Sequence, residues 1–463
     1  MFAGVCAGVV GCVAPSADRQ TGAVEAIYVV AGDRGQSVVR AVVVEGDCPV
    51  LIADGVPRRM DTRTAPEVIA QRATQSQATL SKPSAFSMRV CEISVASPVR
   101  SATVLGRPVP LKKPDPRRVV VIGDTGCRIK ASDNAVQDCL TEQAWPFPAL
   151  ASKAAAERPD LVVHVGDYHY RETACPIGHA GCTGSPWGYG WDAWNADLFV
   201  PASQLMAAAP WVMARDNHEE CSRAGQGWFR LLDPRPFSAQ RSCDQSMNDD
   251  TADFSEPYAV ALGDHWQLIV FDSAKAGNAP LRPDHARDAN IFANYQAEMR
   301  AATALAAAPG MHSIFVSHHP VLGLVPANPY LPKGAGGNPA LLSVIKSLNG
   351  DAYYPPGIAA SLHGHVHVFE AIAFTSAHPS TIVAGHGGDT LDNDLPESLP
   401  AELSPAEGVA IESIVHSNGF GYLVIDRHPD GWVLRAKRLD GEVLVTCALS
   451  VSGLSCDRHG SVK

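Results

Sequence analysis

Five short apolar runs in the middle of the chain are each followed at once by a cluster of polar residues. The runs lie at 118–122, 161–165, 211–214, 314–316 and 358–362. Continuous apolar runs of this length are typical of strands that are buried on both faces of a sheet. Between them lie stretches of helical composition at 148–157, 292–308 and 341–348. Strands that alternate with helices indicate βαβ units, so the pattern predicts an α/β fold.

Shorter apolar runs flank this central part on both sides. They lie at 26–30, 37–44, 49–52 and 86–95 before it, and at 421–426, 432–438 and 443–450 after it. Turn-forming Gly, Asp and Pro residues separate them. We expect a small all-β N-terminal domain at 20–111, a linker at 112–116, and a larger domain at 117–463. In the larger domain two sheets would pack face to face as a sandwich flanked by helices.

The polar clusters contain side chains that bind metal ions. They read Gly-Asp-Thr-Gly from Gly123, Gly-Asp-Tyr-His-Tyr from Gly166, Asn-His-Glu from Asn217, His-His-Pro from His318 and Gly-His-Val-His from Gly364. In α/β sheets, residues beyond the carboxyl ends of the strands form the binding site. One such cluster alone is more often an ordinary turn. Together they supply enough ligands for two metal ions that share a carboxylate, an arrangement suited to in-line displacement at phosphorus.

The five motifs, in this order, resemble those of the calcineurin-like metallophosphoesterases, and among these the purple acid phosphatases. The discriminating residue is Tyr170, because most metallophosphoesterases have no tyrosine there. The resemblance covers about 118–389 and implies two metal sites. The first would hold Fe(III), with a coloured tyrosinate, and the second Zn, Mn or Fe(II). The implied ligands are Asp124, Asp167, Tyr170 and His367 in the first site, and the bridging Asp167 with Asn217, His318 and His365 in the second.

The resemblance also implies the reaction, which is attack on a phosphomonoester by a metal-bound hydroxide. His218 would hydrogen-bond to the phosphoryl oxygens or protonate the leaving group. The histidine pair leaves an alternative open, because the spacing from Val316 selects His319 as the ligand, whereas the family pattern selects His318. We favour His318 as the ligand and expect His319 to take part in catalysis. The alternative functions are a phosphodiesterase or nucleotidase on the same centre, or a catalytically weakened metal-binding homologue.

Asp216 stands where the family pattern has glycine, which usually supplies a positive φ or a close backbone approach. Aspartate tolerates the left-handed region better than most residues, but it adds a carboxylate beside a site that must accept an anion. We therefore expect Asp216→Gly to raise turnover. Arg215, Arg223 and His386 are candidate substrate-binding residues.

Four aromatic residues occur among glycines in the segment 171–209: Trp187, Tyr189, Trp191 and Trp194. On a glycine-rich loop they could stack on an aryl or nucleoside leaving group. Packing of this loop onto its own domain is at least as good an interpretation. The segment is the predicted rim of the substrate site.

The composition limits the partners and the compartment. The net charge is −11 and no Lys/Arg-rich run occurs, so no nucleic-acid-binding surface is indicated. The family resemblance implies a small phosphate ester as the partner. Ten of the 12 cysteines form neighbouring pairs along the chain, which indicates disulfides, although spacing cannot fix connectivity and free buried thiols are the alternative. The pairs are Cys48 with Cys91, Cys127 with Cys139, Cys175 with Cys182, Cys221 with Cys243, and Cys447 with Cys456. Disulfides predict an exported protein, periplasmic or extracellular.

The first 19 residues are predicted to be the remnant of a signal or lipoprotein leader. They begin with an apolar segment that lacks the basic residues of a secretory signal. Residues 9–12 resemble a lipoprotein cleavage box, in which Cys12 would carry a lipid anchor. No later stretch approaches the length of about 20 apolar residues that a transmembrane helix needs.

Overall fold

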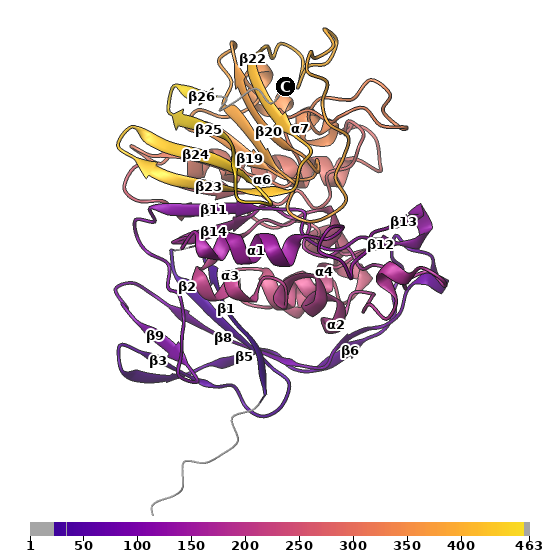
Figure 1. Cartoon of the computed structure of the whole chain (residues 1–463), viewed down its shortest axis with the longest axis vertical. Coiled ribbons are helices and arrows are strands. Elements are labelled where there is room, and N and C mark those ends of the chain that lie inside the picture. Colours follow the sequence, from indigo (N-terminus) through magenta and orange to yellow (C-terminus); the bar gives the residue numbers. More distant parts are fainter. Residues whose placement is uncertain (1–22, 34, 458–463) are drawn as a thin grey trace, which may run out of the picture.

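Two large β-sheets form the centre of the computed structural model, which describes residues 23–33 and 35–457 (Figure 1). The first sheet has the strand order β26-β25-β24-β23-β11-β14-β15-β1-β2-β8-β5. Its strands are β1 (Val24–Ala31), β2 (Ser37–Val43), β5 (Asp61–Thr64), β8 (Arg89–Val95), β11 (Arg118–Ile122), β14 (Leu161–His164), β15 (Trp211–Met213), β23 (Gly421–His428), β24 (Gly431–Arg438), β25 (Val443–Ser450) and β26 (Gly453–Asp457). The predicted leader at 1–19, with Cys12, lies outside the described residues.

The second sheet has the order β16-β17-β18-β19-β21-β20-β22. Its strands are β16 (Tyr258–Ala261), β17 (Trp266–Val270), β18 (His312–Val316), β19 (Ile358–His363), β20 (Phe369–Phe374), β21 (Ser380–Ala384) and β22 (Ile411–Ser417). Smaller sheets contain β3 (Val50–Ala53), β4 (Val56–Arg59), β9 (Ala102–Val104) and β10 (Arg107–Pro108), then β6 (Glu67–Ile69) with β7 (Ser84–Phe86), and β12 (Ile129–Lys130) with β13 (Ala135–Val136). In both large sheets, parallel strands in the middle adjoin antiparallel strands at the sides.

The helices lie outside the sheets. The longer ones are α1 (Phe147–Ala156), α6 (Ala289–Ala306) and α7 (Pro339–Asn349), close to the predicted ranges, and the shorter ones are α2 (Trp191–Trp194), α3 (Ser203–Ala208), α4 (Gly225–Gly227) and α5 (Asp249–Ala252). The start of α7 shows how the sequence sets a boundary. Asn338 accepts a hydrogen bond from the backbone N–H of Leu341, and Pro339 occupies the first helical position, where no N–H is needed.

Successive side chains along each strand point to opposite faces of the sheet, and this divides the core into layers. On β11, Val119 and Val121 face the second sheet, whereas Val120 and Ile122 face the layer that contains α1 and α3. The opposite face of the second sheet packs against α6 and α7. Continuous apolar runs are needed because each strand is buried on both sides. The predicted two-sheet sandwich flanked by helices is therefore confirmed.

The N-terminal region consists of strands, as predicted, with a small core of its own between β2, β3 and β9. Its strand β1 also pairs in parallel with β15, with Val30 opposite Trp211. The strands β1, β2, β8 and β5 thus extend the first sheet, and in Figure 1 they form the lower end of the molecule. The division of the chain into separate domains at 20–111 and 117–463 stays a prediction.

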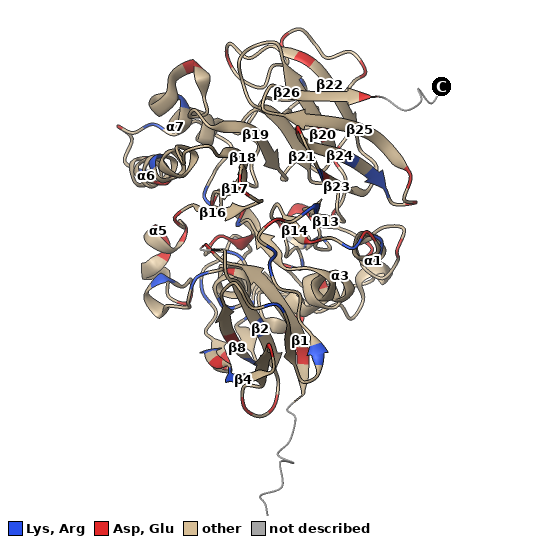
Figure 2. Ribbon diagram, turned by 90° about the vertical axis from the view of Figure 1, so that its left-hand side faces the viewer, with Lys and Arg blue, Asp and Glu red and all other residues tan. Residues whose placement is uncertain are grey.

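Five disulfides join the cysteine pairs that the sequence suggested: Cys48–Cys91, Cys127–Cys139, Cys175–Cys182, Cys221–Cys243 and Cys447–Cys456. Among the described helices, none has the length and apolar character needed to cross a membrane. Figure 2 shows Lys and Arg interspersed with Asp and Glu along the described part of the chain.

Candidate metal centre

The polar motifs meet at the carboxyl ends of β11, β14, β15, β18 and β19. Three motif residues that are not glycine have a positive φ: Asp124 (55°), Asp167 (57°) and His365 (69°). Such conformations cost energy and cluster at functional sites. The loops are hydrogen-bonded to one another, since the N–H of Asp124 donates to the carbonyl of Gly166, and that of Gly364 to the carbonyl of His318, both at 2.9 Å.

Two of the motif glycines leave room for the ligands. A Cβ on Gly166 would collide with the carboxylate of Asp216 and the imidazole of His318. A Cβ on Gly364 would lie 2.5 Å from the Asp124 carboxylate. Glycine is therefore required here by close approach, and at Gly166 also by a φ of 111°.

The first cluster of metal-binding groups consists of Asp124, Asp167 and His367, whose ligand atoms lie within 4.8 Å of one another. Nε2 of His367 is 3.3 Å from Oδ1 of Asp124. The hydroxyl of Tyr170 joins them: it donates to Asp167 and lies 3.4 Å from Asp124 Oδ1 and 3.1 Å from His367 Nε2. The structure thus brings together all four residues that were predicted for the first metal.

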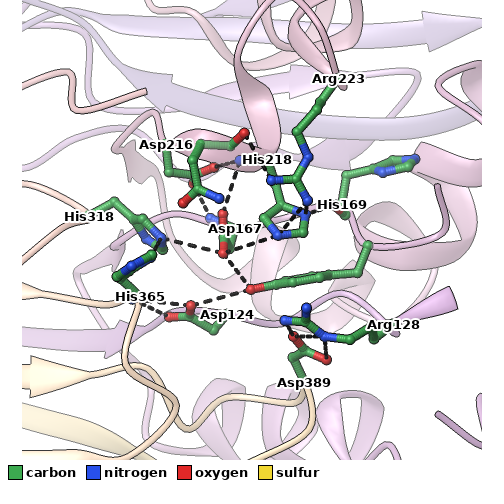
Figure 3. A network of polar contacts seen from close by, with 12 residues as sticks. Asp124, Arg128, Asp167, His169, Asp216, His218, Arg223, His318, His365 and Asp389 are labelled. Atoms are coloured by element: carbon green, nitrogen blue, oxygen red, sulfur yellow. Dashed lines mark hydrogen bonds and ion pairs between the residues drawn. The ribbon is translucent and has the colours of Figure 1, made fainter. Parts of the chain in front are cut away.

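The second cluster consists of Asp167, His318 and His365, again within 4.8 Å. Nε2 of His318 is 3.3 Å from Asp167 Oδ2, and it is also 3.3 Å from Nδ1 of His365. Figure 3 shows Asp167 in the middle of this network. Oδ1 of Asn217 is buried and has no hydrogen-bond partner within the described part of the chain. A buried amide oxygen without a partner is costly in a purely structural role, and it fits a metal ligand.

The histidine pair is resolved by these contacts. His318 belongs to the second cluster, whereas Nδ1 of His319 faces the hydroxyl of Ser273 at 3.1 Å. The ring of His319 packs against that of His365, with centroids 4.1 Å apart, and does not line the cavity beside the clusters. The catalytic role predicted for His319 therefore has no support from its position, and the geometry favours a supporting role behind His365.

Burial and mutual charge set the protonation of the ligands. Burial raises the pKa of Asp124 to about 6 and that of Tyr170 well above its ordinary value. Burial opposes the charged form of His367, but Asp389 and Asp124 together raise its pKa to about 10. For His365, burial and the nearby His318 lower the pKa to about 3. Since metal ligands must be deprotonated, metal binding at this centre would release protons from Tyr170 and His367.

A cavity of about 600 Å³ opens beside the two clusters. Asp167, Asn217, His218, His365 and His367 form its inner end. The ring of His218 lies against the guanidinium of Arg223, with Nη2 2.6 Å from Nε2, and burial together with Arg223 holds the pKa of His218 well below its usual range. Both His218 and Arg223 line the cavity.

The sequence profile of the calcineurin-like phosphoesterases matches residues 117–369, more than half of the chain. The chain belongs to the calcineurin-like phosphoesterase family. The solved structure of PhoD has the same fold, with 11% identity, a TM-score of 0.53, and coverage of 96% of this chain and 94% of PhoD. This family binds a dimetal centre, and the two clusters that share Asp167 supply groups that could hold two metal ions.

Two further solved structures match with lower TM-scores. Purple acid phosphatase PPD1 from seeds of yellow lupin (Lupinus luteus) is 14% identical, with coverage of 94% of this chain and 77% of its own and a TM-score of 0.49. A dimetal phosphatase from Danio rerio is also 14% identical, with coverage of 75% and 100% and a TM-score of 0.38. No curated protein sequence matches this phosphoesterase.

Asp216 does not occupy a strained turn in this phosphoesterase. Its φ of −148° and ψ of −173° are extended, so a residue with a side chain fits without cost. Its carboxylate accepts hydrogen bonds from the N–H groups of Asp167, His218 and Glu219, and caps the short helix Asn217–Glu219. The carboxylate of Asp216 thus lies beside Asp167 but is turned toward the loop backbone, and the effect of Asp216→Gly on turnover stays a prediction.

Two predicted substrate residues of the phosphoesterase lie elsewhere. The guanidinium of Arg215 donates to Ala252 and lies 3.3 Å from Asp272 and 3.6 Å from Asp253, all outside the cavity. His386 is buried against Phe369 and also does not line the cavity. The substrate roles predicted for Arg215 and His386 are corrected, because both side chains are enclosed by other parts of the protein.

The predicted aromatic rim is also corrected. Tyr189, Trp191 and Trp194 are buried in the main core, so this loop packs onto its own domain. Trp187 instead lies beneath the ammonium group of Lys82. None of the four aromatic residues lines the cavity.

The sequence did not single out Arg128, Lys130 or Asp389. Arg128 lies over the ring of Tyr170, 4.6 Å from its centroid, and forms an ion pair with the fully buried Asp389. Asp389 is in turn 3.6 Å from Nδ1 of His367. This pair therefore supports two ligands of the first cluster from outside, as outer partners at metal sites commonly do. The only sequence signal was the position of Arg128, four residues after Asp124.

Proposed function

We propose that this protein hydrolyses phosphomonoesters at a binuclear centre of the purple acid phosphatase type. The observation that supports this most strongly is the position of Tyr170. Its hydroxyl lies among Asp124, Asp167 and His367, while Asp167 also belongs to the cluster with His318 and His365. One carboxylate common to two clusters and one phenol in a single cluster are what an unequal pair of metal ions requires.

The donor sets fit two different ions. Carboxylate and phenolate oxygens of Asp124, Asp167 and Tyr170, with His367, suit the hard ion Fe(III). Imidazoles of His318 and His365 with the unpartnered amide oxygen of Asn217 suit Zn, Mn or Fe(II). When bound, such a pair lowers the pKa of water and offsets negative charge on a phosphoryl group.

The protein's own residues then hold the substrate. His218 and Arg223 line the cavity side by side and can donate hydrogen bonds to phosphoryl oxygens. Arg223 is fixed by Glu172 and by the carbonyl of Asn217 at 3.2 Å, so its guanidinium is oriented before a substrate arrives. Groups held in place in this way bind charge at little cost of reorganisation.

Export to the periplasm or the extracellular space is part of the proposal. Its support is the set of five disulfides, which persist only in an oxidising compartment. Three of them follow the metal motifs directly along the chain: Cys127–Cys139, Cys175–Cys182 and Cys221–Cys243.

The test is a set of measurements on purified protein supplied with iron and zinc. We expect bound metal, a visible absorption band, and faster hydrolysis of phenyl phosphate than of diphenyl phosphate. Tyr170→Phe should lose the band yet keep part of the metal, because only one ligand is removed. A colourless wild type with full iron occupancy would contradict the tyrosinate. Dominant diester turnover would instead indicate a phosphodiesterase, and bound metal with neither activity a weakened homologue.

A further inference from the structure

The cavity beside the metal-binding clusters has two unlike sides. One side carries the basic residues Arg128, Lys130 and Arg223. The other side is formed by the segment 320–339, here called the lip, which contributes Pro320, Val325, Tyr330, Leu331, Ala335 and Pro339. A volume of about 600 Å³ leaves ample space beyond the phosphoryl group, and the lip borders this space.

The lip has a fixed shape. Val325 and Ala335 form an antiparallel bridge with two hydrogen bonds, of 2.8 and 2.9 Å. At its base, the N–H of Asn338 donates to the carbonyl of Pro320 at 2.7 Å. At its tip, Oδ1 of Asn328 accepts hydrogen bonds from the N–H groups of Tyr330 and Leu331, both at 2.9 Å. These contacts hold the tip residues in place without help from a ligand.

The tip of the lip exposes large apolar side chains at the mouth of a polar site. The exposed fraction is 93% for Tyr330 and 40% for Leu331. Scattered apolar residues are normal on a protein surface, but a phenol ring and a leucine on neighbouring positions of a fixed loop beside a cavity are typical of ligand contact. Tyrosine in particular presents a rigid aromatic face at a low entropic cost.

The positive charges of the basic side are largely balanced by carboxylates of the protein, so the basic side is not suited to bind more than one phosphoryl group. Arg223 is paired with Glu172, and Arg128 with Asp389. Nζ of Lys130 lies 2.9 Å from a carboxylate oxygen of Asp133. Because each of these cations has its own carboxylate, the site does not favour polyphosphate chains, and the selectivity has to come from the lip.

We infer that the lip binds the alcohol part of the substrate, and that this part is apolar and contains an aromatic ring. The inference rests on the proposed function, since the phosphoryl group has to lie between the metal-binding clusters and the basic side. The ring would then extend toward Tyr330 and Leu331, with Pro320 and Val325 beneath it. The substrate class is the phosphate esters of aryl-substituted alcohols, rather than sugar phosphates or inorganic polyphosphates.

The test compares 2-phenylethyl phosphate with ethyl phosphate on the metal-loaded protein. Both are primary alkyl esters, so their leaving groups are matched and only the ring differs. Contact with one aromatic face and neighbouring aliphatic groups should raise kcat/KM by about tenfold for the phenylethyl ester. The double variant Tyr330→Ser/Leu331→Ser should bring this ratio close to one. The matched control is Met247→Ser, which removes an 81% exposed apolar side chain outside the cavity and should keep the ratio.

Binding of non-hydrolysable phosphonates separates the inference from the proposed function. Calorimetry should show 2-phenylethylphosphonate binding about tenfold more tightly than ethylphosphonate, and the double variant should lose this difference. If the esters turn over equally and the phosphonates bind equally, the inference is wrong and the proposed function stands. If neither ester turns over but the phosphonates still differ, the proposed function fails and the lip keeps its role. An unchanged ratio in a double variant that melts normally would overturn the inference.

Discussion

The metal-binding end of the cavity and the lip differ in how strongly neighbouring residues constrain their side chains. Asp124, Asp167 and His318 are buried at the ends of buried strands, and Asp167 belongs to one cluster with Asp124 and to another with His318. Tyr330 and Leu331 are exposed at the tip of a loop in which their backbone N–H groups donate to the side chain of Asn328. At the metal-binding end nearly every substitution disturbs several neighbours, whereas at the lip a side chain can change alone. We therefore expect substitutions at the metal-binding end to affect the reaction, and substitutions at the lip to affect substrate preference.

The largest effect is expected at the residue common to both clusters. Asp167→Asn keeps the shape of the side chain but removes the charge that would hold two cations together, so the protein should lose both metals and at least about a thousandfold of its turnover. Metal analysis and hydrolysis of phenyl phosphate measure this. Asp430→Asn, at an aspartate whose side chain is 89% exposed and distant from the cavity, is the control. Full metal occupancy in Asp167→Asn would show that Asp167 does not bridge two metal ions. The metal-binding end would then tolerate a substitution as the lip does.

A smaller effect is expected behind the metal-binding end. Asp216→Gly removes the cap of the helix Asn217–Glu219 and leaves the buried N–H of Asp167 without this acceptor, which should cost about 1–2 kcal/mol of stability and weaken metal binding. This prediction is opposite to the one from the sequence, that glycine here raises turnover. Asp216→Asn, which keeps one side-chain acceptor oxygen, should lose less. Denaturant unfolding and metal titration measure these effects. Higher turnover in Asp216→Gly would instead support the expectation from the sequence.

The smallest effect at neutral pH, which grows as the pH falls, separates His386 from the ligand histidines. Burial lowers its pKa to about 3, against about 6.5 in the unfolded chain, so the unfolded state binds more protons between these values. Stability should therefore fall as the pH drops from 6.5 toward 3. His386→Gln does not titrate, so its unfolding free energy should fall by about 1 kcal/mol less per pH unit than that of the wild type. His428→Gln, at a half-exposed histidine, is the control. Parallel pH curves for wild type and His386→Gln would contradict the assigned burial.

The sequence was sufficient for the metal-binding end because each ligand follows a strand whose apolar run is unmistakable. The sequence could not predict in which direction the arginine side chains point. Arg128 and Arg215 both lie beside motifs, but the first faces Asp389 next to the cavity, and the second is drawn away by Asp253 and Asp272. Those carboxylates are far away along the chain, so no local pattern reveals them. In the same way, the core position of Trp194 depends on close contact with Gly227, where a Cβ would collide with the indole.

The lip was missed for a different reason. Its apolar residues have neither the period of a strand nor that of a helix. They matter because they line the cavity, which the sequence does not show. The segment 171–209 has a stronger aromatic signal, but its residues Tyr189, Trp191 and Trp194 are buried in the core. The continuity of the first sheet was likewise beyond the sequence, since the partner of Val30 is Trp211.

This last pairing has a consequence for how the chain is made. β1 is synthesised well before its partner β15, and β11 well before its partner β23, where Val121 pairs with Leu423. Contacts between such distant positions close slowly, because long loops have to be ordered first. The part of the sheet that supports Asp124 and Asp167 is thus complete only after β23 has been synthesised. A nascent chain that stops before β23 should remain unable to hold metal, however intact its five motifs are.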